Sequence, residues 1–364
     1  MINLENHLIS KNSTLREALK KLNKLALDSI LFVVDDHDCL LGSLTDGDVR
    51  RGILSGKSTD DLVIDYIQQN PKSIYKDSYE INDVIKFRNN NFRIIPVLDN
   101  QKKIVNILNF RIQKSYLPLD AVIMAGGRGS RLSPLTDITP KPLLKVADKS
   151  IIDYNVERLM NFGIDDFFIS LHYKGNMIKE HFTEKNHSNI KLKFIEENEP
   201  LGTIGAVSLI DNFFHEDVLI TNSDILTEID YEDFYLHHLR SKADMTVASI
   251  PYSVSLPYAV LETTDNKIIS FKEKPKYTYY SNAGIYIIKR EILKNIQSNQ
   301  FYNATDLMKK IIDDKKNLVT YPFYQYWLDI GKPEDFEKAK NDIKNLRFWK
   351  NYFYLINLEF QKVN

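Results

Sequence analysis

The sequence has very little cysteine and no excess of either charge. Cys39 is the single cysteine among 364 residues, so a disulfide within one chain and a cysteine-rich metal site are both excluded. The formal net charge is −1, from 48 Lys and Arg residues against 49 Asp and Glu residues. Proteins that bind nucleic acid or an anionic membrane usually carry clustered basic residues, so we expect neither partner.

Long hydrophobic runs are also missing. No uninterrupted apolar stretch approaches the roughly 18 residues that a membrane-spanning helix needs. The first residues, MINLEN, lack the basic segment and apolar core of a signal peptide, so we expect a cytoplasmic protein. With 43% hydrophobic and 27% charged residues, the composition is typical of a globular chain, and the length suggests two or three domains.

Residues 1–115 contain a weak internal repeat. The segment VVDDHDCLL at 33–41 aligns with VLDNQKKIV at 97–105, and each reads as an apolar strand, an Asp-containing turn and a second strand. We expect a helix before each copy, at 15–27 with Ser13 as its N-cap and at 79–89. Two such units in tandem resemble a pair of CBS domains.

The resemblance to CBS domains includes a candidate ligand site. Thr45 and Asp48 match positions that commonly bind the ribose or phosphate of an adenosine nucleotide in that family. The second copy has Asn109 and Ile112 instead, so the resemblance implies at most one regular nucleotide site. A pair that serves only for dimerisation is the alternative.

A short linker, residues 114–119, precedes a change of pattern at Asp120. Strands and helices then alternate, which predicts a three-layer α/β domain over 119–345 with a mixed, mainly parallel sheet. Ligands of such sheets bind beyond the carboxyl ends of the strands. Residues 346–364 are rich in aromatic side chains and are expected to form a packing helix. The expected strands are 120–124, 166–171, 191–196 and 217–221, and the expected helices are 150–162, 202–212 and 231–241.

The first strand of this domain leads into the most informative segment of the chain. The runs AGGRGSRLSPLT at 125–136 and TPKPLL at 139–144 combine glycines, which let backbone N–H groups approach a phosphate, with two cations, Arg131 and Lys141. The spacing differs from the P-loop and from the dinucleotide fingerprint. It resembles the signature of the sugar-1-phosphate nucleotidyltransferases, whose catalytic domain is Rossmann-like.

That resemblance implies a role for each residue of the segment and its partners. Arg131 would neutralise the β- and γ-phosphates of the leaving pyrophosphate, and Lys141 would contact the α-phosphate. Asp224 and Asp329, the latter in the run YWLDIGKP, match the family aspartates that bind Mg²⁺, a cation that prefers oxygen ligands. The implied nucleotide-binding residues are Ala125, Gly126, Gly127, Gly129, Ser130, Glu197, Gly202 and Thr203.

Glu197 bears on the choice of base. Relatives that use uracil or thymine usually carry Gln at this position. A carboxylate only accepts hydrogen bonds, so it suits the adjacent N1–H and N2–H₂ groups of guanine. Against pyrimidine carbonyls it would cost roughly 1–3 kcal/mol per unmatched group, which favours GTP. The alternatives are that the Gly126 loop or Glu199 sets the base.

Further segments resemble the sugar-binding motifs of the family. Their glutamate accepts hydroxyls of the sugar, their lysine binds its phosphate, and an Asn-Ala-Gly strand lines the pocket. Ala259 stands where the family usually has glycine, so glucose cannot be assumed. The implied sugar-binding residues are Tyr258, Glu273, Lys274, Asn282 and Gly284.

The combination of both parts resembles bacterial guanylyltransferases that supply activated sugars for surface glycans. Glucosamine 1-phosphate, as used for the nonulosonate legionaminic acid, is the nearest substrate match, and the product would be a GDP-sugar. One alternative is a uridylyl- or thymidylyltransferase for a hexose 1-phosphate. A second is a non-catalytic regulator that binds sugar nucleotides. The presence of all four charged residues implied in catalysis, Arg131, Lys141, Asp224 and Asp329, argues against it. We also expect a homo-oligomer.

Overall fold

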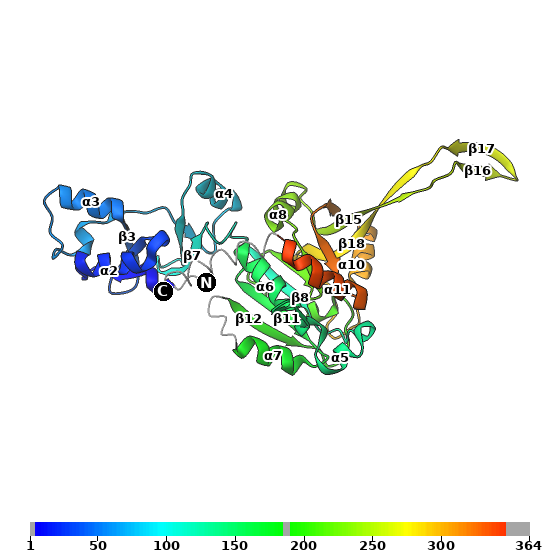
Figure 1. Ribbon diagram of the computed structural model, residues 1–364, viewed down its shortest axis with the longest axis horizontal. Helices are drawn as coiled ribbons and strands as arrows, with labels where there is room; N and C mark the ends of the chain where they lie inside the picture. Colours follow the sequence, from blue (N-terminus) through cyan, green and yellow to red (C-terminus); the bar gives the residue numbers. More distant parts are fainter. Residues whose placement is uncertain (1–3, 185–189, 347–364) are drawn as a thin grey trace. The chain divides into compact units, whose positions relative to one another are not determined.

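The computed structural model describes residues 4–184 and 190–346, which form two compact units. The first unit comprises residues up to Leu117 together with Asn161–Gly163, and the second comprises the rest (Figure 1). Most of the expected aromatic helix at 346–364 lies outside the described residues. None of the described helices has the length and hydrophobicity to span a membrane.

The first unit contains the two predicted repeats, each with its own sheet. The first sheet has the order β1–β2–β3–β4 and the second the order β5–β6–β7. Both predicted hairpins, β2–β3 and β6–β7, are antiparallel, which confirms the interpretation of the repeat. The elements are α1 (Leu4–His7), β1 (Leu8–Ser10), α2 (Leu15–Leu25), β2 (Ile30–Val34), β3 (Leu40–Thr45), α3 (Asp46–Leu54), β4 (Gln68–Gln69), β5 (Ile74–Tyr75), α4 (Ile81–Asn89), β6 (Ile94–Leu98) and β7 (Ile104–Asn109).

The N-cap of α2 is Thr14, so the prediction of Ser13 was wrong. The Thr14 hydroxyl accepts from the Glu17 N–H at 3.3 Å, and the Glu17 carboxylate accepts from the Thr14 N–H at 2.9 Å. This reciprocal capping box requires an acid three residues after the cap, and only Thr14 has one. The helix ends at Leu25, two residues early, because Ala26 adopts a φ of 52°.

The second unit is built on a seven-stranded sheet of order β12–β11–β8–β13–β18–β15–β19. Within it only β18 runs antiparallel to its neighbours. Strands β8, β11 and β13 are buried along nearly all of their length, so both faces are covered, as the three-layer prediction requires. The strands are β8 (Leu119–Met124), β11 (Asp166–Leu171), β12 (Lys191–Glu196), β13 (Asp217–Asn222), β15 (Met245–Ser255), β18 (Lys276–Lys289) and β19 (Leu318–Pro322).

Helices and small sheets complete this unit. Residues 202–212 were predicted to be a helix but form only a 3₁₀ segment, Gly205–Leu209. The N–H groups of Ile204 and Gly205 donate to the carbonyl of Tyr302, so a distant segment fixes this backbone. The remaining elements are α5 (Leu135–Ile138), β9 (Lys145–Val146), β10 (Lys149–Ser150), α6 (Ile151–Asn161), α7 (Gly175–Glu184), β14 (Ile225–Thr227), α8 (Tyr231–Arg240), α9 (Arg290–Leu293), α10 (Ala304–Asp313), β20 (Trp327–Asp329) and α11 (Pro333–Asp342).

Strands β15 and β18 continue past the sheet as a two-stranded arm. Their pairing runs without interruption from Ser249 opposite Asn282 to Ser255 opposite Lys276. At the far end, β16 (Val260–Thr264) pairs with β17 (Lys267–Lys272), and the arm projects from the body of the unit (Figure 1). We call residues 250–281 the arm.

The topology places the glycine-rich loop at a switch point of the sheet. Strand β8 lies between β11 on one side and β13 on the other, and the chain leaves β8 into the loop at Ala125. In open α/β sheets, ligands bind at such points, beyond the carboxyl ends of the strands. The end of β13, which precedes Asp224, lies at the same edge because β13 is parallel to β8.

Candidate active site

The pairing of β14 with β20 brings the two predicted metal-binding aspartates together. Ile225, which follows Asp224, pairs with Asp329, and the N–H of Ile330 donates to the carbonyl of Asp224 at 3.0 Å. These are backbone hydrogen bonds, so the approach of the two acids is fixed by the main chain. The sequence indicated both residues but gave no sign of this small sheet.

Lys141 is buried between these acids. Its ammonium group forms an ion pair with Asp224, and its Nζ lies 3.9 Å from Oδ1 of Asp329. The segment that carries it is flanked by the buried residues Pro140 and Pro142, which restrict the backbone on both sides. A buried lysine held by two carboxylates is a fixed positive charge next to a site that can accept anions.

The environment of Asp329 disfavours its ionised form. Burial raises the pKa of the Asp329 carboxyl above its ordinary value, and the negative charge of Asp224 raises it further. Lys141 and Arg131 act in the opposite direction but do not cancel the effect. Two acids held together against their mutual repulsion are typical of a functional site rather than of a structural core.

The acid pair has the donor set that a divalent cation needs. The Oδ1 atoms of Asp224 and Asp329 are buried and have no hydrogen-bond partner among the described residues. Within residues 4–184 and 190–346, no cluster of three or more His, Cys, Asp or Glu residues could hold a metal ion by itself. Mg²⁺ commonly binds through one or two carboxylates and completes its shell with phosphate and water oxygens, so these residues fit it.

The glycine-rich loop reaches the same place. Gly129 adopts a φ of 67°, and a Cβ there would lie 3.0 Å from the Cβ of Lys141, so both its conformation and its packing require glycine. Arg131 is exposed, and its guanidinium lies against Gly331, where a Cβ would be 3.3 Å from Nη2. The N–H of Ala125 donates to Ser170 in β11, which anchors the start of the loop.

Glu197 lies directly against this loop. It is buried, and its Oε2 accepts from the N–H of Leu201 at 3.0 Å. Its Oε1 is directed at Gly126, where a Cβ would be only 2.6 Å away. The other acid considered, Glu199, is exposed. The structure therefore places a carboxylate, with one oxygen already fixed, beside the predicted nucleotide loop.

A pocket of about 260 Å³ opens beside the acid pair. Asn282 and Gly284 of β18 line it, as does Thr203, and Asp329 forms part of its wall. Gly284 adopts a φ of 72°, and a Cβ there would lie 2.7 Å from the Asn222 amide nitrogen. Lining residues that sequence reasoning did not assign to the site include Asn222, Tyr286, Asn303 and Trp327.

Some of these unassigned lining residues lie next to recognisable sequence motifs, and others do not. Asn222 directly follows the strand predicted at 217–221 and precedes Asp224 by two residues, and Trp327 belongs to the same run as Asp329, so the sequence motifs could have indicated both. Asn303 lies in a connection with no motif and enters the pocket because Tyr302 bonds to the segment at Ile204. That contact is long-range and has no local signature.

The predicted sugar-binding residues fall into two groups. Asn282 and Gly284 line the pocket, whereas Tyr258, Glu273 and Lys274 lie on the arm and are not among the lining residues. Tyr258 is 78% exposed, and the other two are also exposed. The structure thus does not bring the five residues together within one chain.

Thr45 and Asp48 of the first unit cap a helix. Asp48 accepts from both the N–H and the hydroxyl of Thr45, at 2.8 and 2.6 Å, at the start of α3. Arg51 pairs with the second oxygen of Asp48. The two residues are therefore adjacent, as a shared nucleotide contact would require, and their binding role stays a prediction.

Comparison with known proteins gives the family. Residues 120–345 match the model of the nucleotidyl transferase family. The chain belongs to this family. A CBS-domain model matches residues 6–55, within the first repeat. Both matches agree with the resemblances that the sequence motifs carried.

Two curated relatives and one solved structure illustrate the similarity. The chain is 32% identical over 232 residues to D-glycero-α-D-manno-heptose 1-phosphate guanylyltransferase of Aneurinibacillus thermoaerophilus, covering 62% of this chain and 99% of the relative. It is 29% identical over 227 residues to mannose-1-phosphate guanyltransferase of Schizosaccharomyces pombe, covering 60% of this chain and 62% of that protein. The solved structure is a Bacillus anthracis protein named as a glucose-1-phosphate thymidylyltransferase, in complex with sucrose. It has a TM-score of 0.50 at 22% identity, and the match covers 64% of this chain and 98% of that one. This similarity supports the fold.

Proposed function

We propose that this nucleotidyl transferase moves GMP from GTP onto a sugar 1-phosphate, giving a GDP-sugar and pyrophosphate. The observation that carries the proposal is the buried Lys141 between Asp224 and Asp329, beside a glycine-rich loop that Glu197 contacts. The names of the two curated relatives, both guanylyltransferases for sugar 1-phosphates, support the choice of reaction. Both substrates are cytoplasmic metabolites, so we place the reaction in the cytoplasm.

The reaction is an in-line substitution at the α-phosphorus. An oxygen of the sugar phosphate attacks, and the bond to the pyrophosphate oxygen breaks. Such transfers depend on positioning and on neutralising charge. We assign Lys141 to the α-phosphate and Arg131 to the departing pyrophosphate, one on each side of the bond that breaks. Mg²⁺, held by Asp224 and Asp329, would supply further positive charge at the phosphate oxygens.

Base selection is assigned to Glu197. Its Oε2 already accepts from the Leu201 N–H, so Oε1 is the acceptor that remains for a base bound over Gly126. Guanine offers N–H groups on its N1 and N2 edge, and an acceptor-only carboxylate matches them. Thr203, Gly202 and the loop residues Gly127 and Ser130 complete the proposed nucleotide contacts.

The sugar would occupy the pocket lined by Asn282 and Gly284. Three asparagine amides, from Asn222, Asn282 and Asn303, line it, and amides can both donate to and accept from sugar hydroxyls. We propose that the substrate is a hexose-type 1-phosphate. Glucosamine 1-phosphate is the first to test, followed by the mannose and manno-heptose 1-phosphates in the names of the relatives.

The test is a matrix of nucleotides and sugars. Pyrophosphate release would be measured with GTP, UTP, dTTP, ATP and CTP, each with the three sugar 1-phosphates and with Mg²⁺ or EDTA. We expect turnover with GTP and Mg²⁺ and none with EDTA. Efficient use of UTP or dTTP without GTP would support the uridylyl- or thymidylyltransferase alternative. Tight binding of GDP-sugars without turnover in any combination would support the regulator.

For the first unit we propose a CBS pair, residues 1–115, that binds one adenine nucleotide through Thr45 and Asp48, attached to a catalytic domain at 119–345. Calorimetry of the full chain with AMP, ADP and ATP tests it. Binding should occur at one site and should weaken at least about tenfold in Asp48→Asn, since a lost hydrogen bond to a charged group costs about 1.5–3 kcal/mol. Absence of binding by all three nucleotides would leave dimerisation as the role of the pair.

A further inference from the structure

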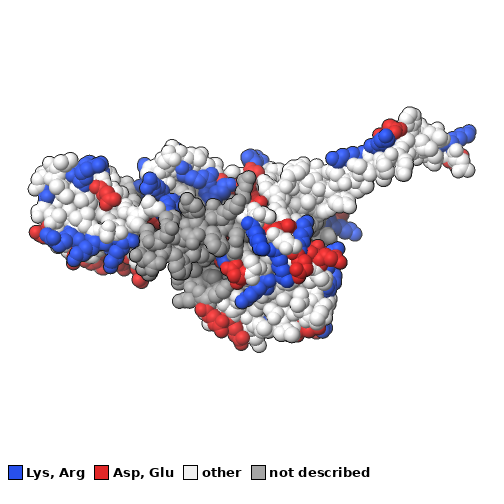
Figure 2. Space-filling model, in the orientation of Figure 1, with Lys and Arg blue, Asp and Glu red and all other residues white. Residues whose placement is uncertain are grey.

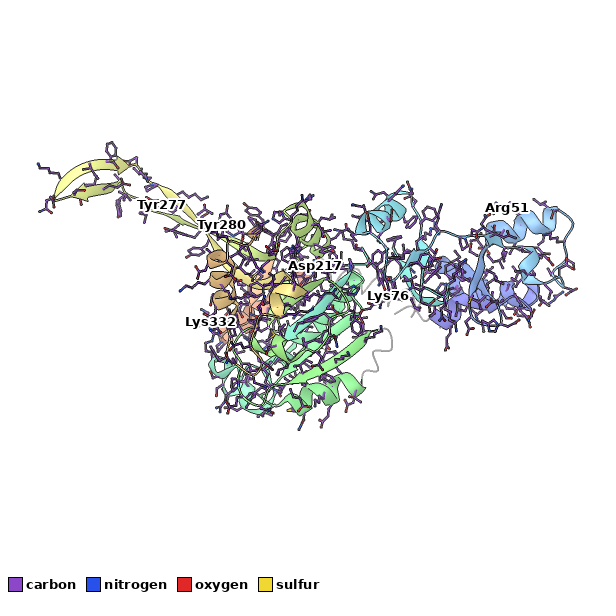
Figure 3. The ribbon with its side chains drawn as sticks, turned by 180° about the vertical axis from the view of Figure 1, so that it is seen from behind. Arg51, Lys76, Asp217, Tyr277, Tyr280 and Lys332 are labelled. Atoms are coloured by element: carbon purple, nitrogen blue, oxygen red, sulfur yellow. The ribbon has the colours of Figure 1, made fainter. Side chains whose placement is uncertain are left out.

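The arm exposes far more apolar surface than a free hairpin should. Figure 2 shows that much of its visible surface is neither acidic nor basic, and Figure 3 shows Tyr280 where the arm leaves the body and Tyr277 farther along it. An isolated two-stranded hairpin is marginally stable in water, and a contiguous apolar surface marks an interaction site. The large hydrophobic residues of the arm that are more than half exposed are Tyr252, Tyr258, Leu261, Ile268, Ile269, Phe271, Tyr279 and Tyr280.

The pocket, in contrast, lacks a charge that its proposed substrate requires. A sugar 1-phosphate is a dianion at neutral pH, yet no lysine or arginine is among the residues that line the pocket. The nearby Lys141 is engaged by Asp224. The pocket therefore supplies asparagine amides for hydroxyls and Asp329 for the proposed metal, but no cationic side chain of its own for the phosphate.

The missing groups are on the arm. Lys272, Lys274 and Lys276 flank Glu273 at the bend between β17 and β18, and none of these four side chains is buried. A carboxylate between lysines can accept from sugar hydroxyls while a neighbouring ammonium group pairs with the phosphate. This combination complements what the pocket contains.

The arm cannot reach the pocket of its own chain without losing its own pairing. Lys276 precedes Asn282 by six residues of β18, which at roughly 3.3 Å per residue is about 20 Å of extended strand. The ladder between β15 and β18 is regular over this stretch. Folding Glu273 back over Asn282 would break it, whereas a second copy of the chain can meet the arm as it stands.

We propose that the arm packs on the catalytic unit of a second copy and places Glu273 and Lys274 at that copy's pocket. The exchange is reciprocal, so a twofold-symmetric dimer contains two sites, each made of one body and the partner's arm. The apolar side chains of the arm are then covered by the second body. This inference rests on the proposed function, because it assigns the pocket to a sugar 1-phosphate.

Complementation between two inactive variants tests the proposal. Asp224→Asn and Glu273→Gln chains with different affinity tags are co-expressed, and the mixed oligomer is purified through both tags. One site of this dimer combines an intact body with an intact arm, so about half of the wild-type activity is expected. The matched control pairs a wild-type chain with one that carries both substitutions, and it should be nearly inactive because the intact body receives the altered arm.

The opposite pattern would overturn the proposal. If each chain used its own arm, the first mixture would be inactive and the control would keep half of the activity. Recovery of no mixed oligomer, or full activity of the Glu273→Gln homomer, would also overturn it.

A crosslink gives a readout that does not depend on activity. In a Cys39→Ser background, Lys274→Cys and Thr305→Cys place one thiol on the arm and one at the pocket wall. A short bismaleimide should yield covalent dimers, and a bridge within one chain would refute the arrangement. A wild-type protein that forms this dimer but shows no turnover with any nucleotide would refute the proposed function and leave the arm exchange standing.

Discussion

Replacing Glu197 by Gln tests the assignment of base selection most directly. The two side chains have the same shape, so the buried position and the bond to the Leu201 N–H can be kept through the amide oxygen. What changes is the atom directed at Gly126, which becomes an NH₂ donor. Against guanine, that donor faces N–H groups and leaves both sides unmatched.

The magnitude follows from a single contact. One oxygen of Glu197 is used by Leu201, so one charge-assisted hydrogen bond to the base is lost, worth about 1.5–3 kcal/mol. At about 1.4 kcal/mol for each factor of ten, kcat/KM for GTP should fall roughly 10- to 150-fold. For UTP and dTTP the amide meets a carbonyl, so kcat/KM should rise or stay level. The ratio of kcat/KM for GTP to kcat/KM for UTP should therefore fall at least as much as the GTP value itself.

The assay is steady-state pyrophosphate release with GTP and UTP at fixed sugar 1-phosphate. Glu196→Gln is the matched control, because Glu196 is the adjacent acid but is exposed and pairs with Lys179. It should leave the preference unchanged. An unaltered GTP preference in Glu197→Gln, or an equal change in both variants, would refute the reasoning about this carboxylate.

Three further predictions concern the acid pair and the loop. Lys141→Met should lower kcat about 10²–10³-fold, because it removes one group that stabilises charge in the transition state. Lys145→Met, a change at an exposed lysine, should leave kcat unchanged. Equal kcat values for the two variants would contradict the role of Lys141. Folding raises the pKa of Asp329, so the native state loses stability as pH rises past the ordinary carboxyl pKa. Asp329→Asn should therefore abolish activity yet increase the free energy of unfolding at pH 7, measured by urea denaturation. At low pH, where both states are protonated, that gain should disappear. Gly129→Ala should cost about 1–2 kcal/mol in the same measurement because of its φ of 67°, whereas Gly127→Ala, with open space around it, should cost less.

Sequence patterns within a single segment correctly predicted several strands of the catalytic unit. The strands at 166–171 and 191–196 occur with the predicted bounds. The first is buried throughout, and the second is a partly exposed strand at the edge of the sheet. The glycine loop and both aspartates meet as the family resemblance implies. The failures lie where distant segments decide. The 3₁₀ segment at 205–209 depends on Tyr302, and the separation of Glu273 from Asn282 depends on how far β15 and β18 continue past the sheet.

The small sheet formed by β14 and β20 has a consequence for how this chain can vary. Its backbone pairs hold Asp224 and Asp329 side by side, whatever occupies the hundred or so residues between them. Insertions and replacements in that interval, including a hairpin as long as the one here, leave the spacing of the acids unchanged. The position of the acid pair is thereby independent of the length of the arm, so the arm can be shortened or replaced without moving the two acids.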